Sequence, residues 1–211
     1  MKVLLLNGSP HADGCTNRAL VEMISVFESE GIEYEKIHVG QLLIHGCIGC
    51  KQCKYLKHCA LDNDIVNEVA GKFAEADGLV ISSPVYNGSA AGTMVSFLDR
   101  LFYSTRYTFD KRYKVGASVV SARRSGNTLT FEQLNQYFLV SEMPIAAGNY
   151  WNNVFGYTKE DVEKDLEGLQ SMRVLARNMV HLMRSLKLGQ QQYGLPEKEV
   201  RQITNFGDGL K

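Results

Sequence analysis

Uninterrupted apolar runs alternate along this chain with segments whose apolar residues recur at helical spacing. The first run, KVLLLNG at residues 2–8, has no polar alternation and predicts a strand buried on both faces of a sheet. After a polar loop, residues 18–31 place Leu20, Ile24 and Phe27 at helical spacing. The chain therefore opens with a strand, a loop and a helix.

The same alternation continues toward the end of the chain. Further strands are predicted at residues 34–40, 78–82, 114–122 and 143–152. Further helices are predicted from Asp62 or Asp64 to residue 77, over residues 90–103, over a segment ending near Val140, and over about residues 159–186. Five strands that alternate with helices predict an α/β fold, a doubly wound parallel sheet with strand order 2-1-3-4-5 and helices on both faces. Ligands of such sheets bind at the carboxyl ends of the strands, between strands 1 and 3.

Composition adds a single-domain organisation and excludes some partners. With 211 residues, 45% of them hydrophobic, the chain fits one domain over residues 1–188, with a cysteine-rich loop inserted at 45–62 and a C-terminal tail at 189–211. The 23 basic residues equal the 23 acidic residues in number, so we expect neither nucleic acid nor a membrane surface as a partner. The N-terminal apolar run is too short for a signal peptide or a membrane span, so we expect a cytoplasmic protein.

The loop after the first strand has the composition of an anion site. Gly8, Ser9, Gly14, Thr16 and Asn17 supply small polar groups and a freely bent backbone directly before a helix, where amide donors converge. The loop lacks both the lysine of an ATP-binding loop and the glycine spacing of a dinucleotide fold. This favours a tightly held phosphate monoester, although the same residues would also suit a simple turn.

Three further loops are expected at the same edge. SSPVYNGSAAG, at residues 82–92, carries an aromatic ring and open main-chain groups that suit the edge of a planar ligand. Arg123 and Arg124 follow the fourth strand, where they either bind a ligand or form a solvated turn. Tyr150 and Trp151 are expected to leave the fifth strand, where they either line the site or pack under the last helix.

Four of the five cysteines lie close together, at Cys47, Cys50, Cys53 and Cys59. In a reducing compartment such spacing indicates metal or redox chemistry more than structural disulfides. The alternatives are an iron-sulfur cluster, redox-active dithiols or a merely structural loop. Zinc fits less well, because zinc ribbons separate two C-x2-C pairs by a long hairpin. The remaining cysteine, Cys15, is interpreted as a small packing residue.

The motifs LLLNGSPHADGCTNRAL, SPVYNGSAAGTMVSFLDR and YWN together resemble the flavodoxin-fold NAD(P)H-dependent FMN reductase family, over about residues 1–152. The resemblance implies a flavodoxin-like fold in which Ser9, His11, Thr16 and Asn17 bind the FMN phosphate. It also implies that the isoalloxazine ring is bordered by Pro84, Val85, Tyr86, Asn87 and Gly88. Many members of the family have arginine where this chain has His11.

CIGCKQC followed by five residues and Cys59 resembles the C-x2-C-x2-C-x5-C motif of the iron-sulfur flavoproteins, which bind a 4Fe-4S cluster beside FMN. Three thiolates within seven residues can wrap one face of a cluster, and a fourth can close it. A similar loop also occurs in relatives described only as FMN reductases, so the alternatives above stay open.

The resemblance implies an oxidoreductase that transfers hydride from NAD(P)H to FMN and then passes electrons to an acceptor. It implies a homodimer or homotetramer, with a small molecule or a ferredoxin-like protein as redox partner. One alternative is a quinone, azo or nitro reductase without a cluster, whose pocket is shaped by Tyr86, Tyr103, Tyr107, Tyr150 and Trp151. The other is a non-enzymatic electron carrier like a flavodoxin.

The choice between NADH and NADPH depends on whether a cation receives a 2′-phosphate. The candidates lie in or after the helix predicted over residues 90–103, at Arg100, Arg106, Lys111 and Arg112. The alternative interpretation is a solvated charged face.

Overall fold

The computed structural model describes residues 1–200 and residue 202, and it contains the expected parallel sheet. Its strands are β1 (Lys2–Asn7), β2 (Glu33–His38), β3 (Gly78–Tyr86), β4 (Ser89–Ala90), β5 (Val115–Ala122) and β6 (Asn153–Phe155). The order is β2-β1-β3-β5-β6 with every pair parallel, while the short β4 pairs antiparallel with β3. The predicted order 2-1-3-4-5 of the parallel strands is therefore confirmed.

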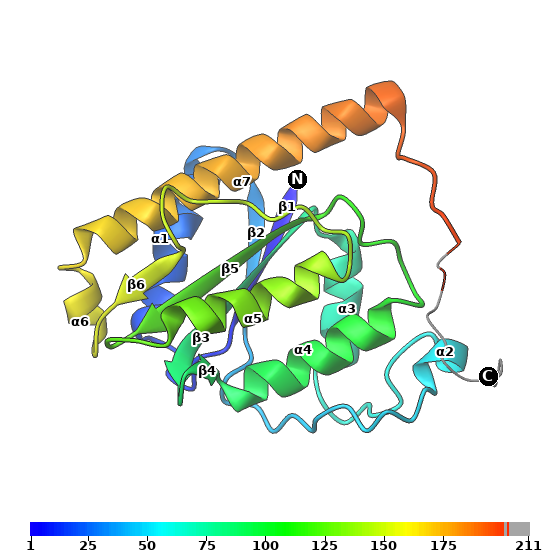
Figure 1. Ribbon diagram of the computed structural model, residues 1–211, viewed down its shortest axis with the longest axis horizontal. Helices are drawn as coiled ribbons and strands as arrows, with labels where there is room; N and C mark the ends of the chain where they lie inside the picture. The colour runs from blue at the N-terminus through cyan, green and yellow to red at the C-terminus, as the bar shows by residue number, and fades with distance from the viewer. Residues whose placement is uncertain (201, 203–211) are drawn as a thin grey trace.

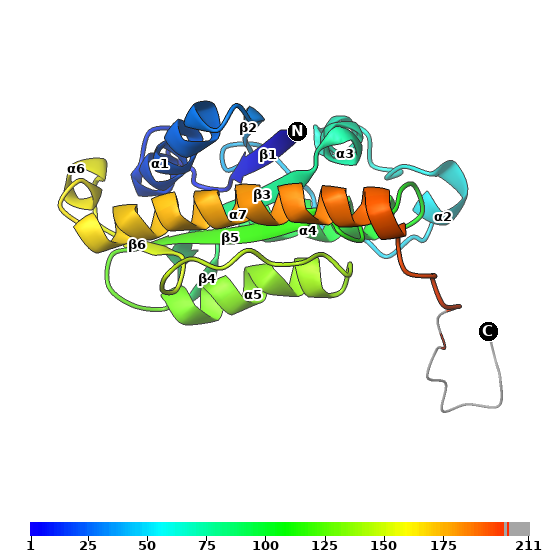
Figure 2. The same ribbon diagram turned by 90° about the horizontal axis from the view of Figure 1, so that it is seen from above.

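Helices cover both faces of this sheet (Figure 1). They are α1 (Cys15–Ser29), α2 (Cys53–Leu56), α3 (Val66–Glu75), α4 (Gly92–Thr105), α5 (Asn127–Leu139), α6 (Lys159–Val162) and α7 (Leu166–Tyr193). Side chains of α1 and α7 share one core with Leu5, while those of α3, α4 and α5 share the other with Leu4 and Leu6. Figure 2 shows α1 and α5 on opposite sides of the sheet. Because β1 is buried on both faces, its sequence carries no polar alternation.

The last parallel strand lies later in the sequence than predicted. The expected strand at residues 143–152 is wrong, because only Ile145 bridges to β5, at Gly116. Pairing resumes where Asn153 meets Val120, so residues 146–152 lie opposite only residues 117–119 and must bulge out of the edge. The alanine and glycine residues of this stretch have little preference for a strand, which explains why the bulge forms here.

The C-terminal helix also differs from its prediction. Two helices, α6 and α7, replace the single one expected over about residues 159–186. The break occurs at Asp165, whose carboxylate accepts hydrogen bonds from the N–H of Gly168 at 2.9 Å and from that of Phe155 at 2.7 Å. This cap starts α7 and ties it to β6.

The expected tail begins inside α7, because this helix continues to Tyr193, beyond the boundary at residue 189. Residue 201 and residues 203–211 of that tail lie outside the described residues. Within the described part of the chain, every helix is too short or too polar to span a bilayer.

Candidate functional site

The loops that follow β1, β3 and β5 meet at the carboxyl edge of the sheet, as their sequence predicts. The hydroxyl of Thr16, at the start of α1, lies 2.7 Å from that of Ser121 in β5. Gly126, in the loop after β5, has a φ of +84°, and an added Cβ would stand 2.8 Å from Val85. These contacts place the predicted phosphate loop, the β3–β4 hairpin and the loop after β5 side by side.

No side chain caps the N-terminus of α1. Its N-cap residue is Gly14, which has no side chain to accept a hydrogen bond from the helix, and the first turn contains no acidic residue. The first-turn amides therefore remain available, and the helix dipole favours an anion there. Ser9 curls the preceding loop, since its N–H donates to Asn7 at 3.0 Å and its hydroxyl accepts the N–H of His11 at 3.1 Å. These groups fit the phosphate of FMN.

Contacts from the end of β2 fix the same loop. An added Cβ on Gly40 would lie 2.0 Å from the carbonyl oxygen of Ser9, so the two backbones are in direct contact. Nε2 of His38 lies 2.6 Å from that oxygen. Sequence reasoning missed both residues, although the predicted order 2-1-3 already places the end of β2 beside the loop after β1.

Sequence reasoning also missed Lys36, a residue of β2 that contacts the start of α1. Its ammonium donates to Oδ1 of Asn17 at 2.6 Å, and Asn17 itself is buried in the first turn of α1. His11, the family's arginine position, is exposed. Lys36 therefore brings a positive charge from a neighbouring strand to the N-terminal end of α1, the predicted anion site.

The β3–β4 hairpin presents the predicted ring-binding residues. Asn87 and Gly88 have φ values of +54° and +79°, the positive values that a two-residue type I′ turn requires. Gln133 of α5 accepts hydrogen bonds from the N–H of Ala90 at 3.0 Å and from the hydroxyl of Ser89 at 2.8 Å. The turn and this brace hold Pro84, Val85 and Tyr86 at the end of β3, where Tyr86 is exposed and the other two are half-buried.

The other expected ligand residues are less closely tied to this edge. Tyr150 and Trp151 precede β6 in the bulge, so the prediction that they leave the end of a strand is wrong. Their rings form an edge-to-face pair with centroids 4.4 Å apart, and the side chains are 60% and 48% exposed. Arg123 and Arg124 are exposed in the loop after β5. Their contact with a flavin stays a prediction.

The four clustered cysteines line one pocket. Cys47, Cys50, Cys53 and Cys59 line the same small, open pocket, and all four are free thiols. Gly49 and Lys51, both with positive φ, turn the chain on either side of Cys50. Burial raises the pKa of the Cys53 thiol, and the three neighbouring thiols raise that pKa further.

A zinc ion and a 4Fe-4S cluster require different arrangements of four thiols. Among residues 1–200 and 202, no three His, Cys, Asp or Glu side chains are arranged to hold one metal ion. Zinc needs its sulfur ligands about 2.3 Å from a single point. A 4Fe-4S cluster instead takes one thiolate on each of its irons, so its ligands surround a body and not a point. The four cysteines supply the number of thiolates that such a cluster takes, and all of them line one pocket.

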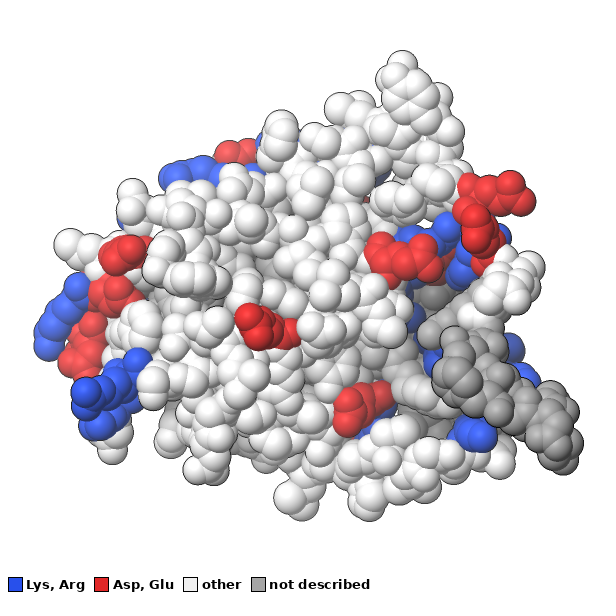
Figure 3. Space-filling model, viewed as in Figure 1, with Lys and Arg blue, Asp and Glu red and all other residues white. Residues whose placement is uncertain are grey.

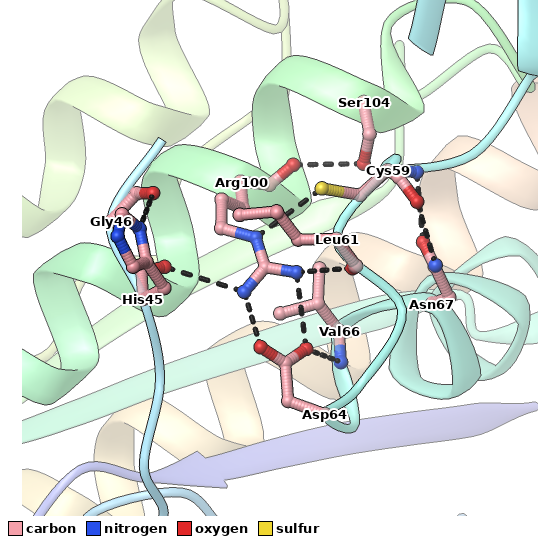
Figure 4. Close-up of polar contacts among 9 residues, drawn as sticks. All are labelled: His45, Gly46, Cys59, Leu61, Asp64, Val66, Asn67, Arg100 and Ser104. Atoms are coloured by element: carbon pink, nitrogen blue, oxygen red, sulfur yellow. Dashed lines mark hydrogen bonds and ion pairs between the residues drawn. The ribbon is translucent and has the colours of Figure 1, made fainter. Parts of the chain in front are cut away.

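Arg100 connects α4 to this cysteine loop (Figure 4). Its guanidinium pairs with both carboxylate oxygens of Asp64 and donates to the carbonyls of His45 and Leu61. Its Nε–H donates to Sγ of Cys59 at 3.3 Å. Burial disfavours its charge, but the hydrogen bonds to Asp64 and Cys59 outweigh this effect and raise the pKa of Arg100.

Two of the four basic side chains considered as partners of a 2′-phosphate are buried. Their burial contradicts both interpretations, contact with a nucleotide and a solvated charged face. Arg100 is 1% exposed and Lys111 is 6% exposed, so neither forms a solvated face or an open anion site. Burial lowers the pKa of Lys111 to about 8. The sequence offered no signal for this, because only the packed fold decides which cations of α4 and its following loop are covered.

Proteins of known family are similar in sequence to this chain. The model of the NADPH-dependent FMN reductase family matches residues 1–157. An iron-sulfur flavoprotein of Methanocaldococcus jannaschii is 31% identical over 194 residues, which is 89% of this chain and 100% of the relative. An iron-sulfur flavoprotein of Methanosarcina thermophila is 24% identical over 185 residues, 87% of this chain and 95% of the relative.

Solved structures support the fold. RosB with a bound riboflavin phosphate intermediate superimposes with a TM-score of 0.71 at 15% identity, over 100% of this chain and 94% of RosB. An archaeal flavodoxin superimposes with a TM-score of 0.55 at 14% identity, over 89% of this chain and 99% of the flavodoxin. The flavodoxin-like fold expected from the sequence is confirmed.

The contact between Gly40 and Ser9 predicts that Gly40→Ala weakens FMN binding. A Cβ at this position collides with backbone, so the phosphate loop must move and lose roughly one charge-assisted hydrogen bond, about a tenfold loss of affinity. Quenching of flavin fluorescence on titration of the cofactor-free protein measures it. Gly71→Ala is the matched control, because nothing lies within 4 Å of its added Cβ. Unchanged affinity in Gly40→Ala would place the phosphate elsewhere.

Proposed function

The chain belongs to the NADPH-dependent FMN reductase family, and from that premise we propose that it takes electrons from NAD(P)H through bound FMN and passes them to an acceptor. The supporting observation is the uncapped N-terminus of α1 lying beside the β3–β4 hairpin. One feature suits the phosphate of FMN and the other its ring. Both are built from residues whose sequence predicts those roles.

We assign the phosphate to Ser9, Thr16, Asn17 and the first-turn amides of α1, with His11 at the rim of the loop. The ring would lie along Pro84, Val85, Tyr86, Asn87 and Gly88, with Arg123, Arg124, Tyr150 and Trp151 as outer contacts. Bound FMN supplies hydride acceptance and the release of single electrons. The chain's own residues need only position the ring and limit its contact with water, so no side chain is required as an acid or a base.

We further propose that Cys47, Cys50, Cys53 and Cys59 hold a 4Fe-4S cluster. Two observations support this: relatives that cover most of this chain are named iron-sulfur flavoproteins, and the four thiols share one pocket. A cluster there would exchange one electron at a time, which suits a ferredoxin-like partner or a small-molecule acceptor. Thiols kept free for this purpose need a reducing compartment, which favours the cytoplasm.

Within one chain, the two proposed sites lie apart. The hairpin strand β4 precedes the start of α4, whereas Arg100, which contacts the cysteine loop, lies eight residues further along that helix, about 12 Å at 1.5 Å per residue. Figure 1 shows α2 of the cysteine loop far from β4. Electrons must therefore cover this length of α4 or pass through a second copy of the chain.

We propose a homodimer or homotetramer. Leu129, Leu139 and Val140 in or next to α5 are between 58% and 71% exposed, and the face that includes α4 and α5 carries few charged side chains (Figure 3). Such a patch is typical of an interface between subunits. Light scattering on the purified protein should report a mass of two or four chains, and a mass of one chain, 23.6 kDa, would contradict the proposal.

The cofactor assignment predicts that two variants lose different cofactors. Anaerobically purified protein should contain one FMN and about four irons and four sulfides per chain. Cys50→Ala should lose iron and keep FMN, because only a ligand is removed. Thr16→Val is the matched control, which should retain iron and bind FMN more weakly. Full iron content in Cys50→Ala would refute the cluster at these cysteines.

The proposed reaction predicts that NADH or NADPH bleaches the flavin absorbance under anaerobic conditions. Stopped-flow absorbance with each nucleotide measures the rate and identifies the preferred donor. If neither nucleotide bleaches the flavin but reduced ferredoxin does, the protein is an electron carrier like a flavodoxin. Turnover with quinone, azo or nitro compounds by a protein free of iron would instead favour the cluster-free reductase.

A further inference from the structure

The buried guanidinium of Arg100 contacts Cys59, one of the four cysteines to which the proposed function gives a 4Fe-4S cluster. We propose that Arg100 and Asp64 are positioning residues that set the reduction potential of the cluster held by Cys47, Cys50, Cys53 and Cys59. This inference rests on the proposed function, since it assumes that the four thiols hold the cluster. It assigns a role to a charged pair that binds neither FMN nor nicotinamide.

Every N–H group of Arg100 donates a hydrogen bond to the cysteine loop or to Asp64, which follows this loop. A guanidinium has five N–H groups, and five contacts are present: one to Cys59, one each to the carbonyls of His45 and Leu61, and two to Asp64. Arg100 is 1% exposed, and the Asp64 side chain is 7% exposed. Such a pair is costly to bury and strongly destabilising to break, so its geometry is closely fixed.

Cys59 is held more firmly than a flexible loop would allow. Its N–H donates a hydrogen bond to Oδ1 of Asn67 at 2.9 Å, and its carbonyl accepts a hydrogen bond from Nδ2 of the same residue at 2.9 Å. Asn67 lies in α3, and Asp64 accepts the N–H of Val66 at the start of that helix. The backbone of Cys59 is thus fixed by α3 while its sulfur receives the N–H of Arg100 from α4.

This geometry dictates the sign of the effect. Reduction adds negative charge to a cluster and its sulfur ligands, so a hydrogen bond to a ligand sulfur and a nearby positive charge both favour the reduced state. Low local dielectric makes these effects larger than at a surface. Arg100 should therefore raise the potential, while the carboxylate of Asp64 partly opposes it.

A purely structural role for Arg100 is the rival explanation. In that case the arginine would only close the loop, and substitutions would alter how much cluster is bound. In that case, removal of the positive charge of Arg100 would not lower the potential, and removal of the negative charge of Asp64 would not raise it. The two explanations therefore differ in a quantity that can be measured on fully loaded protein.

The test is an anaerobic redox titration of the holoprotein, with the reduced cluster followed by electron paramagnetic resonance. Arg100→Gln should lower the one-electron midpoint potential by a roughly tenfold change in equilibrium constant, about 59 mV. Asp64→Asn keeps an oxygen for Val66 and Arg100 but removes the negative charge, so it should raise the potential. Arg177→Gln is the matched control, because Arg177 is exposed on α7, which packs on the opposite face of the sheet from α4, and it should leave the potential unchanged.

Arg100→Lys keeps the test decisive if Arg100→Gln loses its cluster. Lysine retains the charge but lacks the Nε–H that donates to Cys59, so the potential of Arg100→Lys should fall below that of the unmodified protein by less than about 59 mV. The rise in Asp64→Asn should persist. Loaded variants with unchanged potentials, or with shifts of the same sign in Arg100→Gln and Asp64→Asn, would overturn the inference alone. Absence of iron from the unmodified protein would overturn the proposed cluster instead.

Discussion

The parallel pairing of β1 between β2 and β3 is the constraint on which the candidate flavin site depends. Because β1 is hydrogen-bonded on both sides, its end at Asn7 meets the ends of both neighbours at one edge. The hydroxyl of Ser82 in β3 donates to the carbonyl of Leu6 at 2.7 Å, and the N–H of Gly8 donates to the carbonyl of Ser82 at 2.9 Å. The phosphate loop therefore leaves a fixed platform and not a free strand end.

Close backbone packing shapes this loop, while positive charge reaches it from Lys36 of the neighbouring strand β2. Gly40 allows the chain after β2 to touch Ser9, so the loop is shaped by main-chain contacts from its neighbour. An uncapped helix start supplies donors to a ligand only if the preceding loop keeps its curvature. The shape of the site and its chemistry are thus set by different residues, glycines for the first and small polar residues for the second.

The cysteine loop follows a different physical rule, because it belongs to no strand. Its start at His45 and its end at Asp64 are brought together by one arginine of α4, with hydrogen bonds in place of sheet pairing. A buried ion pair adds little net stability compared with apolar packing, but it specifies one arrangement of the groups around it. That specificity matters for the four thiols, because the proposed cluster would need all of them around one body, and it matters less for the remainder of the core.

The sequence by itself determined the α/β class and the four-cysteine set, because both depend on local patterns. The strand order followed from the regular alternation of strands and helices, and the ligand-binding role of the two loops stays a prediction. Uninterrupted apolar runs mark strands buried on both faces, and Asn87-Gly88 marks a tight hairpin turn wherever it lies. The position of the last strand was decided only by the fold, since residues 143–152 and Asn153–Phe155 compete for the same edge of β5. The burial of Arg100, its contact with Cys59 and the support of Ser9 by Gly40 were likewise decided by tertiary structure. Each joins residues at least 31 positions apart, and no local pattern in the sequence encodes such a meeting.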